Sequence, residues 1–172
     1  MLALGLLILR LVVGLTLAAH GAQKLFGWFG GPGLGGWTGA MTRMRIRPAA
    51  PWAWMSALAE FLGGIGLALG FLYPLPSLAI AGSMLVAIAL IHGPKGFWNT
   101  KGGYEFNLTL IAAVAALMLT GPGSIALDSA LGIHFPEPVT LIVLSVLTVL
   151  GVVAALVTRT PAPAPETKPQ TT

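Results

Sequence analysis

Cysteine and charge are what this 172-residue chain lacks most. It contains no cysteine, which excludes disulfides, thiolate metal ligands, cysteine-ligated iron–sulfur clusters and dithiol redox chemistry. Charged residues make up only 8% of the chain and hydrophobic residues 56%, whereas a soluble domain carries about 25% charged residues. So few charges cannot cover a soluble fold of this size, and we predict an all-α bundle of transmembrane helices partly covered by lipid.

Acidic residues are scarcer than basic ones. Five Asp and Glu stand against nine Lys and Arg, which gives a net charge of +4 and a sequence pI of about 10.0. In a membrane protein such an excess reflects basic loops. No basic stripe with interleaved aromatic residues is present, so we expect no nucleic-acid partner. The N-terminus has no basic region before its apolar run, and Arg10 interrupts that run. We therefore expect no cleaved signal peptide.

Five apolar segments predict the helices of the bundle. They cover residues 2–21, 52–72, 75–91, 106–120 and 139–157. A transmembrane helix needs about 20 residues, so the third and fourth segments are short. Residues 22–51, rich in glycine, are expected to form a long loop. The predicted organisation is a helix bundle over 1–130, an additional C-terminal helix within 131–158 and a disordered tail over 159–172.

The charges favour five spans over four. With five, one side of the membrane carries every Lys and Arg except Arg10, and the other carries only Asp128 and Glu137. The positive-inside rule then places the N-terminus outside and the C-terminus in the cytoplasm, in the plasma membrane of a prokaryote. All five tryptophans fall on the predicted inner side. This asymmetry indicates that the first long loop lies folded on the inner interface.

Two ionisable residues fall inside predicted spans, where such residues are functional candidates. Arg10 lies in the first segment and Glu60 in the second. Counted from opposite faces at about 1.5 Å per residue, their depths differ by about 6 Å in a core about 30 Å thick. We therefore predict an Arg10–Glu60 pair facing the bundle interior. The alternative is a structural pair that only sets the helix register.

A second polar group is predicted where the inner helix ends meet. It comprises His20, Lys24, His92, Glu105 and Asn107. Together these residues offer hydrogen-bond donors, a carboxylate and two imidazoles that exchange protons near neutral pH. With Arg10 and Glu60 they predict a polar pocket that opens to the cytoplasmic interface and binds a cofactor. The alternative is a set of interfacial residues that extend to water. We predict no metal site, and no residue is assigned as catalytic.

The order and spacing of these residues resemble the DoxX family. The resemblance covers residues 5–130 and rests on Arg10, His20-Gly21 with Lys24, Glu60 before Gly63-Gly64, His92 with Gly96-Phe97-Trp98, Glu105, and Gly121-Pro122-Gly123 with Asp128. It implies a four-helix membrane core. Some relatives are linked to quinone-dependent sulfur oxidation and others to oxidative-stress defence, while most have no assigned activity. The fifth segment and the proline-rich tail depart from the family pattern.

Several functions fit these observations. The first is a quinone-binding subunit of an oxidoreductase, with quinone as the cofactor; because the chain has no evident electron carrier, a soluble partner protein would supply electrons. The second is a small-solute transporter, which needs access from both faces. The third is a non-catalytic scaffold that recruits soluble redox enzymes through Arg43, Arg45 and Arg47. A bis-histidine haem between His20 and His92 is a fourth. Homo-oligomerisation is compatible with each of them.

Overall fold

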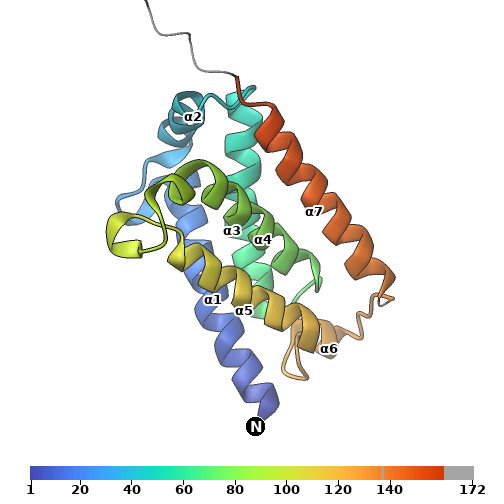
Figure 1. Cartoon of the computed structure of the whole chain (residues 1–172). Helices are drawn as coiled ribbons and strands as arrows, with labels where there is room; N and C mark the ends of the chain where they lie inside the picture. The colour runs from blue at the N-terminus through green and yellow to red at the C-terminus, as the bar shows by residue number, and fades with distance from the viewer. Residues whose placement is uncertain (137, 161–172) are drawn as a thin grey trace, which may run out of the picture.

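The chain folds into an all-helical bundle, as predicted. The computed structural model describes residues 1–136 and 138–160. The α-helices in this part are α1 (Leu2–Phe26), α2 (Gly33–Arg43), α3 (Ala49–Leu69), α4 (Leu75–Ala87), α5 (Glu105–Thr120), α6 (Leu127–Leu131) and α7 (Val139–Val157). A π-helical turn, Ile88–His92, continues α4. Figure 1 shows α1, α3 and α4 at the centre, with α7 along the outer side.

Four helical segments are long and apolar enough to cross a membrane. They are Leu2–Phe26, Ala49–Leu69, Leu75–Lys95 and Val139–Val157. The fifth predicted segment, α5, is also helical but has only 16 residues. All five predicted segments are therefore helices, and four of them have the length of a span. The second predicted segment, 52–72, ends earlier than predicted because Gly70 adopts the left-handed conformation (φ 64°) that terminates α3.

Small residues bring α1 and α3 into close contact. A Cβ atom added to Gly14 would lie 2.5 Å from the carbonyl oxygen of Gly64, and one added to Gly21 would overlap the backbone of Phe61. No larger residue fits at either position without moving the helices apart. These antiparallel contacts determine the register between the two helices.

The connections gather at two ends of the bundle. At one end Ile46 forms an antiparallel bridge with Arg159, and the Thr160 amide donates to the Arg45 carbonyl at 3.0 Å. At the other end the Asp128 amide donates to the Gly70 carbonyl at 3.0 Å. We call the first the basic end, since the loops there carry Lys and Arg, and the second the acidic end. Five helices that run in alternating directions place the connections in these two groups, as the sequence predicted.

The expectation of a long loop over residues 22–51 was wrong, because helix α2 lies within it. Met41 of α2 is 4% exposed and packs in a small core with Ile46 and with Ala53 of α3. Glycine-rich segments have low helix propensity, but burial of an apolar face overrides it. The helix lies across the basic end, beside the start of α3 (Figure 1). The expectation that this segment lies on the inner membrane interface stays a prediction.

Helix α7 packs on the outside of the bundle, chiefly against α4. Its C-terminal end is held by the bridge to Ile46 and by the Arg47 amide, which donates to the Thr158 carbonyl at 3.2 Å. The predicted disordered tail lies outside the described residues from residue 161 onward. The division of the chain at residue 130 stays a prediction.

Candidate functional site

A cavity of about 820 Å³ lies between the helices near the basic end. Residues of α1, α2, α3, α4, α5 and α7 line it. Its walls are mostly leucine, isoleucine, methionine, valine and alanine, with a few polar side chains among them. A volume of this size lies within the range of about 300–1,000 Å³ that small-molecule sites occupy. An apolar cavity with a few convergent polar groups is the usual form of a ligand site.

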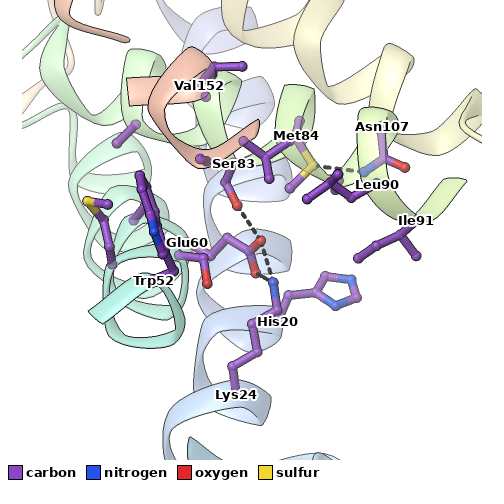
Figure 2. Close-up of a pocket in the computed structure, with 18 of the residues that line it drawn as sticks. His20, Lys24, Trp52, Glu60, Ser83, Met84, Leu90, Ile91, Asn107 and Val152 are labelled. Atoms are coloured by element: carbon purple, nitrogen blue, oxygen red, sulfur yellow. Dashed lines mark hydrogen bonds and ion pairs between the residues drawn. The ribbon is translucent and has the colours of Figure 1, made fainter. Parts of the chain in front are cut away.

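The carboxylate of Glu60 is the polar centre of this cavity (Figure 2). Glu60 is 1% exposed. Lys24 Nζ of α1 donates to both carboxylate oxygens at 2.6 Å, and Ser83 Oγ of α4 donates to Oε1 at 2.7 Å. A buried carboxylate needs such partners, because an unpaired charge in an apolar interior is costly. Three helices therefore supply the carboxylate and its two donors.

Lys24 is positioned by its place in the last turn of α1. Its positive charge is favourable there, where the helix dipole is negative. The ammonium group also lies 4.4 Å from the centroid of the Trp37 ring on α2, a cation–π distance. Trp37 in turn donates from Nε1 to Ser56 Oγ at 2.8 Å. Since the Lys24 side chain keeps 19% of its surface exposed, this cluster is not fully sealed from solvent.

The cavity also includes His20, His92 and Asn107. The His20 ring lies 6.1 Å from the ring of Phe106. His92 ends the π-helical turn after α4, and its Nδ1 is 2.7 Å from the Gly102 carbonyl oxygen. Asn107 is 5% exposed, and its amide donates to the thioether sulfur of Met84 at 3.2 Å. The cavity thus brings these three residues together with Lys24 and Glu60.

The predicted Arg10–Glu60 pair is not formed. Arg10, 1% exposed, donates from Nη2 to the carbonyl of Ile125 and lies against Gly70, at the acidic end. Asp128 lies at the same end, where its amide donates to the Gly70 carbonyl. It lines a separate void of about 10 Å³, far smaller than the main cavity. Arg10 is therefore not part of the candidate site.

The prediction failed because it took the depth of each residue from the ends of its own segment. In the structure Gly21 packs against Phe61, so Glu60 lies beside the last turns of α1. Arg10 precedes Gly21 by roughly 17 Å along the helix at 1.5 Å per residue. An arginine side chain cannot cover that distance.

Glu105 is also outside the cavity. One of its carboxylate oxygens accepts a hydrogen bond from the Asn99 amide at 3.0 Å, and the Glu105 amide donates to the Phe97 carbonyl at 2.9 Å. It therefore stabilises the turn before α5 rather than the candidate site. Its place in the first turn of a helix also suits the helix dipole.

Sequence reasoning did not assign four residues of these two regions to a site. They are Ser83, Trp37 and Trp52, which line the cavity, and Asp128 at the acidic end. Asp128 is 4% exposed and accepts from the Leu72 and Tyr73 amides, each at 2.9 Å. The available signal for Asp128 was its place after the Gly121-Pro122-Gly123 turn, whereas no signal distinguished Ser83.

Comparison with known proteins identifies the family. No curated protein matches the chain, and no solved structure does. The model of the DoxX family matches residues 5–93, which is more than half of the 172 residues. The matched region includes α1, α3, α4 and the Lys24–Glu60–Ser83 cluster, and it ends before α5 and α7. This chain is therefore a membrane protein that belongs to the DoxX family.

Proposed function

We propose that the chain binds a lipophilic quinone in this cavity and acts as the membrane subunit of a quinone-linked oxidoreductase. The observation that carries the proposal is the buried Glu60 carboxylate, held by Lys24 and Ser83 in the middle of an apolar cavity. A lipophilic quinone likewise combines a polar part, the ring carbonyls, with an apolar part, the hydrocarbon tail.

The polar groups suit the quinone ring. Quinone carbonyls accept hydrogen bonds, and Lys24, Ser83 and Asn107 are donors. Asn107 now donates to a thioether, which is a weak acceptor, so a carbonyl would replace that contact favourably. The ammonium of Lys24 would stabilise negative charge on the ring as electrons arrive. His20 and His92 could carry the two protons that reduction to the quinol consumes.

A soluble partner protein would supply the two electrons, since the chain contains no cysteine for a thiol or iron–sulfur carrier. Transport of a solute is less well supported. The cavity does not extend to the Arg10 cluster, where the void is only about 10 Å³. A transporter needs polar access from both faces of the membrane.

Quinone binding can be measured by tryptophan fluorescence. Of the tryptophans, Trp37 and Trp52 line the cavity. In a variant with the remaining three replaced by Phe (W28F, W54F, W98F), a quinone should quench the fluorescence of these two. We expect E60Q to raise Kd about tenfold or more, because Glu60 positions Lys24 and Ser83, two of the donors to the ring, and a hydrogen bond to a charged group contributes about 1.5–3 kcal/mol. H92A removes an imidazole from the same cavity and should also raise Kd.

The matched control is E105Q, which neutralises a carboxylate outside the cavity. It should leave Kd unchanged. Equal affinities for E60Q, H92A and the parent protein would reject this site, and absence of quenching in the parent would reject the proposed function.

We also propose that the basic end faces the cytoplasm of a prokaryotic cell. The described cations near that end are Lys24, Arg43, Arg45, Arg47, Lys95, Lys101 and Arg159. Because the chain has no cysteine, single thiols report its topology directly. In intact spheroplasts an impermeant maleimide should label S124C at the acidic end and spare T100C at the basic end. The reverse pattern would overturn this orientation.

A further inference from the structure

The cavity has an apolar lobe on one side of Glu60. In Figure 2 Trp52 lies on the opposite side of the carboxylate from His20 and Asn107. Helices α3, α4 and α7 form this lobe, and α7 lies outside the region that the family model matches. Its lining residues include Met55, Ala59, Gly82, Thr148, Gly151 and Val152.

The α7 wall of this lobe offers no free polar group among the lining residues. Thr148 uses its hydroxyl to donate to the Leu144 carbonyl at 2.8 Å. Its methyl group faces α4, since a Cβ added to Gly82 would lie 3.1 Å from Thr148 Cγ2. A wall of methyl and methylene groups favours hydrocarbon over a polar ligand.

The lobe reaches the surface of the bundle between α3 and α7. Met55 of α3 is 51% exposed and Gly151 of α7 is also exposed, yet both line the cavity. Both helices are long and apolar enough to cross the membrane. The opening between them therefore faces the hydrocarbon of the bilayer.

We propose that the lobe between α3 and α7 holds the isoprenoid tail of the quinone, and that it makes this protein selective for long-tailed quinones over tailless rings. The inference rests on the proposed function. The polar ring lies near Glu60, and the tail leaves through the α3–α7 opening into the lipid. A polar cluster that is continuous with an opening to lipid, within one cavity, matches a molecule with a polar ring and a hydrocarbon tail.

Gly151 allows a direct test of this lobe. A Cβ added there meets no atom within 4 Å, so a large side chain fits at this cavity-lining position without moving a helix. Replacing glycine inside a helix also removes a penalty of about 1 kcal/mol relative to alanine. Gly5 of α1 is the matched control, since it is helical and exposed and its added Cβ also meets nothing within 4 Å.

The experiment compares two quinones with the same ring, one with an isoprenoid tail and one with a methyl group in its place. G151F should raise Kd for the tailed quinone about tenfold, equivalent to about two buried methylene groups, and leave the short quinone unchanged. G5F should change neither, which controls for partition into detergent. If G151F binds the tailed quinone as tightly as the parent protein does, or if its affinity for the tailed and the short quinone falls equally, the tail site alone is overturned. Failure of both quinones to bind the parent protein would overturn the proposed function as well.

A second measurement does not depend on a large side chain. In G151C the introduced thiol is the only one in the protein. Bound tailed quinone should slow its alkylation by N-ethylmaleimide, whereas the short quinone should not, and S124C should be unaffected by either. Slower alkylation with added phospholipid but not with the tailed quinone would show that an acyl chain occupies the lobe, and would overturn the proposal.

Discussion

The two buried polar clusters of this protein differ in the space around them. At the basic end Glu60 pairs with Lys24 beside a cavity of about 820 Å³. At the acidic end Arg10 lies beside a void of about 10 Å³, room for about one water molecule. Both clusters have an ionisable group that is 1% exposed. The difference teaches that a buried charge marks a ligand site only where the packing around it leaves room for a ligand.

The largest expected effect is on stability at the acidic end. R10M should lower the free energy of unfolding by about 1.5–3 kcal/mol, because the hydrogen bond from the Arg10 guanidinium to the Ile125 carbonyl is lost. Thermal unfolding in detergent measures this loss. Quinone affinity of the folded fraction should be unchanged, and weakened binding in R10M would show that the two clusters are coupled.

Breaking the pair at the basic end should cost less. K24M should destabilise by about 1–2 kcal/mol, since water in the cavity beside Glu60 can hydrate the carboxylate that has lost its partner. The double variant K24M/E60Q should recover most of this loss. A cost for K24M as large as that for R10M would indicate that this cluster is structural too.

Two serines of α4 allow a direct comparison of how accessible the two clusters are to a small reagent. Ser83 lines the main cavity, whereas Ser77 is 0% exposed and lies beside the small void near Arg10. In single-cysteine variants, S83C should react with N-ethylmaleimide at least about tenfold faster than S77C, because the thiolate must be accessible to react. Equal rates would contradict the distinction between an open and a closed cluster.

The smallest effects should come from single hydroxyl groups. Y73F should destabilise by about 1 kcal/mol, because the Tyr73 hydroxyl donates to the buried Leu117 carbonyl at 3.1 Å. S83A should cost about 0.5 kcal/mol, the lower end for a hydrogen bond, since Glu60 keeps both contacts to Lys24 and water in the cavity can replace the serine hydroxyl. Denaturant titration measures the loss in the free energy of unfolding for both variants. A larger loss in S83A than in Y73F would contradict this order.

Much of the candidate site could be predicted from local sequence. His20, Lys24, His92 and Asn107 lie near the ends of apolar segments, so the alternation of helices was enough to place them at one end. Ser83 could not be recognised, because serine is common in membrane helices and only its packing opposite Glu60 gives it a role. The turn contact of Glu105 depends on the loop before α5, whose conformation has no periodic signal.

Composition and hydrophobic pattern were sufficient for the membrane class, the helical segments and the charge difference between the two ends, because lipid demands long apolar helices whatever their arrangement. The pairing of the charges was decided by packing. Close contact at Gly14 and Gly21 sets the register of α1 on α3, which brings Lys24 rather than Arg10 to Glu60. Such contacts depend on the shapes of both helix surfaces, and counting residues along one segment cannot predict them.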